Sequence, residues 1–245
     1  MLLHPTLEQL HALRLNGMAA ALREQSAMDA VAELGFEERL GLLLDREHAV
    51  RETRRMHTRL RKAKLRQDGV VEDIDFRHPR GLDKSLVLRL ADCRWIKDHH
   101  NLIITGPTGV GKSYLACAFA HKACREGFSS LYLRVSKLFE DLGLAKGDGR
   151  YLKLLTGLAK TDLLVLDDYG LGPLNRDQRH DLLEILEDRH GLKSTLVTSQ
   201  LPLELWHEQI GDPTMADAIL DRLVHSAHTI QLKGESMRKK KAHLT

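Results

Sequence analysis

The 245-residue sequence has only three cysteines, and no two of them form a CxxC motif. An odd number without that spacing supports neither a zinc site nor a disulfide framework, so we expect Cys93, Cys117 and Cys124 to be small buried thiols. No apolar run approaches the ~20 residues of a membrane span, and the N-terminus lacks the uninterrupted apolar core of a secretion signal. We therefore expect a cytoplasmic protein with no membrane partner.

Charge of one sign is concentrated in two segments, although the net charge is only +3. Residues 51–66 contain eight Arg or Lys and one Glu, a net charge of +7. Residues 233–241 contain five Arg or Lys and one Glu, a net charge of +4, so the rest of the chain carries −8. Such segments are typical of contact with a polyanion. The alternative is a solvated helix face, which like charges at i,i+4 disfavour. The candidate DNA-binding cations are Arg51, Arg54, Arg55, Arg59, Arg61, Lys62, Lys64, Arg66, Lys239, Lys240 and Lys241.

Apolar residues at helical spacing predict an all-helical segment at the start of the chain. Thr6 and Gln9 match a capping box at the beginning of the first helix, and Gly17 is a weak point within it. A second helical stretch runs from Phe36 to about residue 66. We interpret 1–68 as a helical DNA- or partner-binding domain and 69–81 as a linker.

From about residue 82, short apolar runs alternate with helical segments. This alternation predicts an α/β fold with a five-stranded parallel sheet between helices, and ligands at the carboxyl ends of the strands. Residues 82–245 form this domain and end in a short basic tail. The predicted strands are 101–105, 131–135, 163–166, 195–198 and 229–232. Asn175 and Gln178 match a capping box at the start of a helix between the third and fourth strands.

Residues 106–113, GPTGVGKS, fit the pattern G-x-x-x-x-G-K-[ST] and lie between a predicted strand and a predicted helix. Glycines let successive backbone N–H groups converge on phosphate oxygens, and the following helix directs its positive end at the same anion. Lys112 can bridge the β- and γ-phosphates of ATP, and the Ser113 hydroxyl can bind Mg²⁺. The predicted nucleotide-binding residues are Gly106, Pro107, Thr108, Gly109, Val110, Gly111, Lys112, Ser113 and Tyr114.

The third predicted strand ends in two carboxylates, Asp167 and Asp168. One can hold the Mg²⁺ shell and the next can orient or deprotonate the attacking water; the alternative is a pair that begins a turn before Gly170. The fourth strand ends near Gln200, which could hold the lytic water or simply satisfy the strand end. The sequence therefore predicts ATP hydrolysis.

The order of phosphate loop, acid pair and polar strand end resembles the AAA+ ATPases, in particular the clade of initiators and helicase loaders. The resemblance implies that Asp167 is linked to Mg²⁺, that Asp168 activates water and that Gln200 is the first sensor. Two departures are Asp168, where Glu is commoner, and Gln200, where Asn is commoner. Arg222 lies in a stretch resembling that of the arginine finger; the alternative is a helix-surface arginine paired with Asp217 or Asp221.

Two further features match this clade. Residues 136–162 have room for two helices around 147–149, which resembles the extra helix of initiators and loaders. After the fifth predicted strand only residues 233–245 remain, too few for a full C-terminal lid. We therefore expect a neighbouring subunit to complete the site, with Arg222 or Arg238 acting in trans.

The resemblance covers nearly the full length in the IstB-like transposition helper ATPases. It rests on residues 13–18, 36–40, the phosphate loop, 198–202 and 232–238. It implies a homo-oligomer on double-stranded DNA, bound with little sequence preference, that assists a partner transposase, IstA. The alternatives are a replicative helicase loader of the DnaC type, a small-molecule phosphotransferase, and a non-hydrolysing ATP-bound scaffold.

Overall fold

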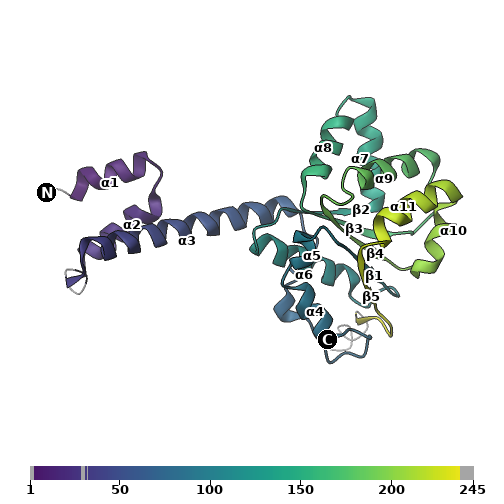
Figure 1. The fold of residues 1–245 in the computed structure, drawn as a ribbon, viewed down its shortest axis with the longest axis horizontal. Helices are drawn as coiled ribbons and strands as arrows, with labels where there is room; N and C mark the ends of the chain where they lie inside the picture. The colour runs from purple at the N-terminus through teal and green to yellow at the C-terminus, as the bar shows by residue number, and fades with distance from the viewer. Residues whose placement is uncertain (1–2, 29–30, 32, 238–245) are drawn as a thin grey trace, which may run out of the picture. The chain divides into compact units, whose positions relative to one another are not determined.

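The computed structural model describes residues 3–28, 31 and 33–237 (Figure 1). The chain divides into two compact units, Met1–Thr58 and Arg59–Thr245. The division falls before the predicted boundary at residue 68, because residues from Arg59 onward pack on the α/β unit. The Arg59 Nε, for example, donates a hydrogen bond to the carbonyl of Cys124 at 2.8 Å.

The first unit consists of α1 (Leu3–Ala12), α2 (Asn16–Ser26) and the first part of α3 (Phe36–Ala63). The prediction of one helix weakened at Gly17 is wrong: α1 and α2 are separate, and Arg14 between them has a φ of 59°. The predicted capping box is also wrong, because α1 already begins at Leu3 and Thr6 lies inside it.

Gly17 lies at a close contact between α2 and α3. Its N–H donates a hydrogen bond to the Glu47 carboxylate at 2.7 Å, and the N–H of Met18 donates to the same oxygen at 3.1 Å. A Cβ atom at position 17 would lie 2.7 Å from the Glu47 Cα. The glycine is therefore required by a close helix contact, and the carboxylate accepts from the free N–H groups at the start of α2.

The second unit contains the end of α3 and the α/β core. Its further elements, in chain order, are η2 (Val71–Asp73), α4 (Lys84–Leu90), α5 (Arg94–Lys97), β1 (Asn101–Thr105), α6 (Lys112–Arg125), β2 (Ser130–Arg134), α7 (Val135–Gly147), α8 (Tyr151–Lys160), β3 (Leu163–Tyr169), α9 (Arg176–Glu187), β4 (Ser194–Ser199), η3 (Leu203–Leu205), α10 (Trp206–Ile210), α11 (Pro213–Val224) and β5 (Ala227–Gln231).

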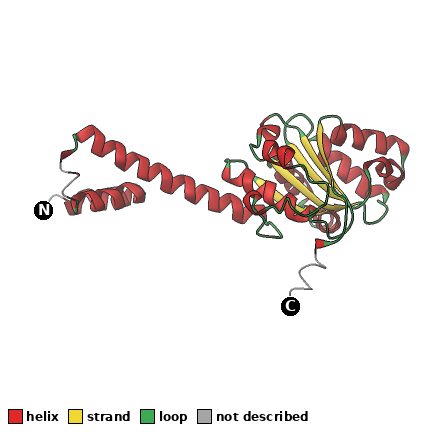
Figure 2. Cartoon of the chain, turned by 90° about the horizontal axis from the view of Figure 1, so that it is seen from below, coloured by secondary structure: helices red, strands yellow, loops and turns green. Residues whose placement is uncertain are grey.

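The five strands form one parallel sheet in the order β2-β3-β4-β1-β5. Each prediction of a strand is confirmed in position, with small shifts at the ends; β5, for example, begins at Ala227. Figure 2 shows helices on both sides of the sheet. Because all strands run in one direction, their carboxyl ends meet at a single edge.

Side chains alternate between the two faces of the sheet, as the period of a strand requires. Leu102 and Ile104 of β1 belong to an apolar cluster with α6, whereas Ile103 belongs to a second cluster with α7, α9 and α11. Burial on both faces explains why β3 is apolar from Leu163 to Leu166. The sheet is therefore a rigid base for the loops at its carboxyl edge.

Two local predictions from the sequence are confirmed in the second unit. Residues 136–162 contain two helices, α7 and α8, as expected. Asn175 caps α9 in a capping box: its side chain accepts from the N–H of Gln178, whose side chain accepts from the N–H of Asn175. Both results depend on short-range signals.

The predicted linker, residues 69–81, differs from expectation, because much of it packs on the α/β core. Val71 and Ile74 are buried, and Arg80 is only 2% exposed. A Cβ atom at Gly69 would lie 2.9 Å from the carbonyl oxygen of Tyr114. This segment therefore packs against the core beside α6.

The three cysteines are free and buried, as predicted. Burial raises the pKa of the Cys93 thiol to about 12, which keeps it protonated and unreactive near neutral pH. Within the described residues, none of the helices combines the length and apolarity needed to cross a lipid bilayer.

Candidate nucleotide-binding site

The loop between β1 and α6 has a backbone conformation that depends on its glycines. Gly106, Gly109 and Gly111 have φ values of 144°, 85° and 99°, a region that other residues rarely adopt. A Cβ atom at Gly106 would also lie 2.4 Å from the carbonyl oxygen of Leu232. The predicted phosphate loop thus curls at the carboxyl end of β1, directly before the N-terminus of α6.

Lys112 is the first residue of α6, and its side chain turns back into this loop. Its ammonium donates hydrogen bonds to the carbonyls of Gly106 and Pro107, at 2.7 and 2.8 Å. The residue is only 6% exposed. The loop therefore holds a positive charge at its centre, where N–H groups and the start of a helix also favour an anion.

Ser113 and Asp167 meet beside the loop. The Ser113 hydroxyl donates to both carboxylate oxygens of Asp167, at 3.0 and 2.9 Å. Tyr132 of β2 and Thr198 of β4 also donate to this carboxylate, which is fully buried. A hydroxyl and a carboxylate are hard oxygen ligands of the kind that Mg²⁺ prefers, so these residues fit that ion. In the described residues, no group of three or more His, Cys, Asp or Glu offers another metal site.

Asp168 has an unusual backbone. Its φ is 61°, and the pairing of β3 with β4 is irregular between Leu166 and Tyr169. Its N–H donates to the Thr198 hydroxyl at 3.1 Å. Burial, and then the neighbouring Asp167, raise the pKa of the Asp168 carboxyl above its usual value. A partly buried carboxyl with a raised pKa beside a phosphate loop is suited to proton transfer.

Arg66 lies at the same acid pair. Its Nη1 is 3.8 Å from Asp168 Oδ2 and 4.0 Å from Asp167 Oδ2. The sequence predicts Arg66 as a DNA-binding cation, and no local pattern links it to residues so much later in the chain. That prediction remains untested, but the guanidinium lies beside the acid pair at the carboxyl end of β3.

A cavity of about 430 Å³ opens between the loop and the acid pair. This volume is in the range of small-molecule sites. It brings together predicted residues of the loop, Asp168 and Gln200 with others that were not predicted. The lining residues are Gln67, Asp73, Asp75, Arg80, Thr108, Gly109, Gly111, Lys112, Ser113, Tyr114, Asp168, Gln200 and Met237.

Gln200 follows β4 and reaches the phosphate loop. The Thr108 hydroxyl donates a hydrogen bond to Gln200 Oε1 at 2.6 Å, across 92 positions of the chain. The side chain therefore lies between the loop and the end of β3, where a sensor would be needed. Its role as a sensor remains a prediction.

Arg80 and Met237 are site residues that the sequence reasoning did not identify. Arg80 Nη1 donates to the carbonyl of Val110 at 2.9 Å and approaches Met237 Sδ at 3.1 Å. The N–H of Met237 donates to the carbonyl of Gly109 at 2.9 Å. The only signal for Met237 was its place in a stretch that carries the family resemblance, and Arg80 lay in the presumed linker.

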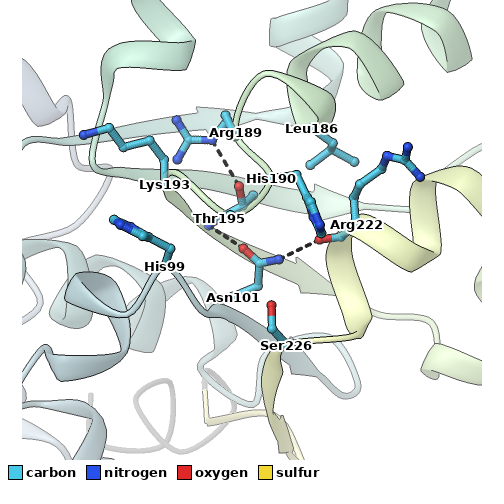
Figure 3. A pocket seen from close by; sticks show the side chains of 10 residues that line it. His99, Asn101, Leu186, Arg189, His190, Lys193, Thr195, Arg222 and Ser226 are labelled. Carbon is cyan, nitrogen blue, oxygen red and sulfur yellow. Dashed lines mark hydrogen bonds between the residues drawn. The ribbon is translucent and has the colours of Figure 1, made fainter.

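Arg222 of α11 lies near Asn101 and His190 in Figure 3. Asn101, at the amino end of β1, donates a hydrogen bond to the Arg222 carbonyl at 2.9 Å, whereas the phosphate loop follows the carboxyl end of β1. The Arg222 guanidinium pairs with Glu187 and lies 3.6 Å from Asp221. Arg222 is thus not part of this chain's own phosphate site; its action on a neighbour remains a prediction.

The small cavity drawn in Figure 3 is a packed structural feature rather than a second ligand site. Arg189, which is 1% exposed, donates to the Thr195 hydroxyl at 3.1 Å and to the carbonyls of Thr161 and Ser194. Its guanidinium therefore satisfies backbone groups at the amino ends of strands.

Three further cations of the basic segment contact other groups of the chain. Arg51 pairs with Glu47 at 2.6 Å and Arg55 with Glu52 at 2.6 Å, while Arg59 bonds the Cys124 carbonyl. The tail residues Arg238, Lys239, Lys240 and Lys241 lie outside the described residues. The cations with an exposed side chain that remain as candidates for a polyanion are Arg54, Arg61, Lys62 and Lys64.

Solved structures share this core. The chain resembles a structure of the DnaC helicase loader with a TM-score of 0.56 and 22% identity, covering 70% of this chain and 100% of that one. It resembles DnaI with a TM-score of 0.56 and 25% identity, covering 67% and 91%. The sheet order and the phosphate loop place the protein in the class of AAA+ P-loop ATPases.

Within that class, the chain belongs to the family of IstB-like ATP binding proteins, whose sequence pattern matches residues 8–245. It is 56% identical over 239 residues to the putative insertion sequence ATP-binding protein y4pL of Sinorhizobium fredii, covering 98% of each chain. It is 52% identical over 203 residues to the insertion sequence IS1162 putative ATP-binding protein of Pseudomonas fluorescens, covering 82% of this chain and 88% of that one. The protein is therefore an ATP-binding AAA+ protein.

Proposed function

We propose that this chain is an ATP-dependent regulator of DNA transposition, which oligomerises on duplex DNA, prepares the target and recruits a partner transposase. The observation that carries the proposal is its similarity, over nearly its whole length, to proteins named as insertion-sequence ATP-binding proteins. The site geometry supports ATP hydrolysis as the switch between its states.

The residues of the site have separate tasks in this proposal. The N–H groups of the phosphate loop and the Lys112 ammonium bind the phosphates, and Ser113 with Asp167 holds the metal ion. Mg²⁺, when bound, supplies charge neutralisation at the β- and γ-phosphates. Asp168 orients the attacking water and accepts its proton, and Gln200 positions that water from β4.

Completion of the site falls to a neighbouring copy. The Arg222 guanidinium pairs with Glu187 and lies away from the phosphate loop of its own chain. The γ-phosphate that it would reach is therefore that of the next subunit. An arginine supplied in trans stabilises charge that develops in the transition state. We expect turnover per subunit to be slow when the chain is dilute and to rise with concentration and with DNA; a constant value across a dilution series contradicts assembly.

DNA binding is assigned to the exposed cations of the basic segment, Arg54, Arg61, Lys62 and Lys64. No base-reading motif is evident in the sequence, so we expect contacts with phosphates and little sequence preference. Such binding weakens steeply with salt, because it releases counterions.

The test combines the purified chain, duplex DNA and the transposase encoded next to it. With ATP or a non-hydrolysable analogue, we expect a DNA complex that retains the transposase in a pull-down and appears as an ordered oligomer by electron microscopy. With ADP, both should be lost. A complex that ignores the nucleotide, or a transposase that is never retained, would refute the proposal.

A second candidate is a replicative helicase loader, supported by the likeness of the core to DnaC and DnaI. A pull-down against a replicative helicase and the neighbouring transposase in parallel separates the two functions. An ATP-dependent, salt-sensitive gel shift with DNA would exclude a nucleotide kinase, and release of phosphate would exclude a non-hydrolysing scaffold.

A further inference from the structure

Arg66 approaches the acid pair from outside the AAA+ motifs. The helix α3 ends at Ala63, and Lys64, with a φ of 51°, breaks it. The chain then turns so that Arg66 Nη1 is 3.8 Å from Asp168 and 4.0 Å from Asp167. About 45% of the Arg66 side chain is exposed, so the guanidinium faces both the acid pair and the solvent.

The backbone on either side of this guanidinium packs on the α/β core. Leu65 packs against the apolar cluster of β1 and α6. Gln67 lines the nucleotide cavity, and a Cβ atom at Gly69 would lie 2.9 Å from the carbonyl oxygen of Tyr114 on α6. The flexible part of this residue is therefore its side chain, which can leave the acid pair while its Cα stays in place.

Arg66 is the cation that lies against both members of the acid pair. Its Nη1 is 3.8 Å from Asp168 Oδ2 and 4.0 Å from Asp167 Oδ2. The same oxygen of Asp167 accepts a hydrogen bond from the Ser113 hydroxyl at 2.9 Å. The guanidinium thus lies beside both carboxylates and beside the oxygen that Ser113 contacts.

We propose that Arg66 is a built-in competitor of the divalent cation: its guanidinium neutralises the acid pair when the metal is absent and must withdraw when the metal binds. A divalent ion held by Ser113 and Asp167 would lie within a few ångströms of this guanidinium, and like charges at that separation repel strongly. Arg66 therefore sets the Mg²⁺ concentration at which the site fills. The proposal rests on the ATP site of the proposed function and requires neither DNA nor a transposase.

The test is a Mg²⁺ titration of the binding of a fluorescent, non-hydrolysable ATP analogue to the full chain without DNA. Replacement of Arg66 by Gln should lower the half-saturating Mg²⁺ concentration roughly three- to tenfold, the range expected for a partly exposed charge pair. Arg66→Lys, which keeps the charge but not the planar guanidinium, should lower this concentration less than Arg66→Gln does. Arg94→Gln is the matched control, since Arg94 pairs with Asp92 on the surface at 2.6 Å.

The outcomes are distinct. An unchanged or higher Mg²⁺ midpoint in Arg66→Gln overturns the proposal, because the residue would then be neutral toward the metal or would help to hold it. Arg66→Met serves as a second variant, and thermal unfolding of each checks that the fold is intact. If the unmodified chain binds no analogue at any Mg²⁺ concentration, the ATP site of the proposed function fails instead.

Discussion

The Ser113 hydroxyl donates hydrogen bonds to both carboxylate oxygens of Asp167, although 54 positions separate the two residues. This contact joins the first turn of α6 to the end of β3. Tyr132 from β2 and Thr198 from β4 donate to the same carboxylate. The proposed metal ligand is therefore oriented by three neighbouring elements, an arrangement that preorganises a site.

Removal of the Ser113 hydroxyl should weaken binding of Mg²⁺–ATP while the fold remains. In Ser113→Ala, Asp167 keeps its bonds from Tyr132 and Thr198, so we expect little loss of stability. We expect the apparent affinity for the nucleotide to fall about tenfold or more with Mg²⁺ and to change little in EDTA. Ser113→Thr retains the hydroxyl and is the control. Equal losses with and without Mg²⁺ would contradict the assignment, and calorimetry in both buffers measures them.

Asp168→Asn should separate nucleotide binding from hydrolysis. The amide cannot accept the proton of the attacking water, so we expect the rate of phosphate release to fall on the order of 10²- to 10⁴-fold with ATP binding intact and the ATP state retained on DNA. Burial and the charge of Asp167 raise the pKa of Asp168. Since only its ionised form is a base, hydrolysis should decline, as pH is lowered, at a higher pH than for an ordinary Asp.

The matched measurement is the pH–rate profile alongside ATP binding at each pH. If the decline in rate follows a loss of nucleotide binding, the base is not Asp168. Rapid hydrolysis by Asp168→Asn would also show that Asp168 is not the base.

The contact between Gly17 and Glu47 should control the stability of the first unit. Gly17→Ala places a methyl group 2.7 Å from the Glu47 Cα, and overpacking of this kind costs about 1–3 kcal/mol. Gly41→Ala on α3 is the control, because a Cβ there meets nothing within 4 Å. Hydrogen exchange of α1 and α2 measures the effect; equal protection in both variants would contradict the packing.

The same carboxylate predicts a dependence on pH. Burial raises the pKa of Glu47, but hydrogen bonds from Arg51, Met18 and Gly17 outweigh it, so the pKa lies below its ordinary value of 4.5. The stabilisation is thus fully present above pH 4.5 and is lost as the pH falls through the native pKa. Glu47→Gln should abolish this pH dependence in the first unit. Hydrogen exchange of α1 and α2, compared between the variant and the unmodified chain at about pH 3 to 6, measures it.

Prediction from the sequence worked best where the signal is local. An apolar run followed by two aspartates located β3 and the acid pair, because a buried parallel strand must deliver its next residues to one edge of the sheet. The glycine pattern similarly located the phosphate loop. No pattern in the sequence predicted the approach of Arg66 to the acid pair, the place of Arg80 in the cavity or the packing of the segment after residue 68, because contacts between distant parts of the chain leave no periodic signal.

Replacement of the exposed cations Arg54, Arg61 and Lys62 by Gln should weaken DNA binding irrespective of sequence. For every phosphate that these side chains no longer neutralise, the slope of log K against log salt should flatten by about 0.9. The control triple removes three cations that pair with acids elsewhere on the surface: Arg94, Lys137 and Arg150. Gel shifts at several salt concentrations measure both. An identical slope in the two triples would move the DNA site to the ATPase core or the C-terminal tail.

Arg222 provides the sharpest test of a shared active site, because it lies at the opposite end of β1 from its own phosphate loop. Arg222→Ala should bind ATP normally and lose roughly 10³-fold in turnover when assembled on DNA, while Lys112→Ala should lose ATP binding and the assembly that depends on it. Glu187→Gln breaks the same ion pair but keeps the arginine, so its turnover should be preserved. Mixing Arg222→Ala with Lys112→Ala should restore activity, since an intact arginine then adjoins an intact nucleotide site. If the mixture is as inactive as its parts, Arg222 does not act on a neighbour's nucleotide, and its role is limited to the pair with Glu187.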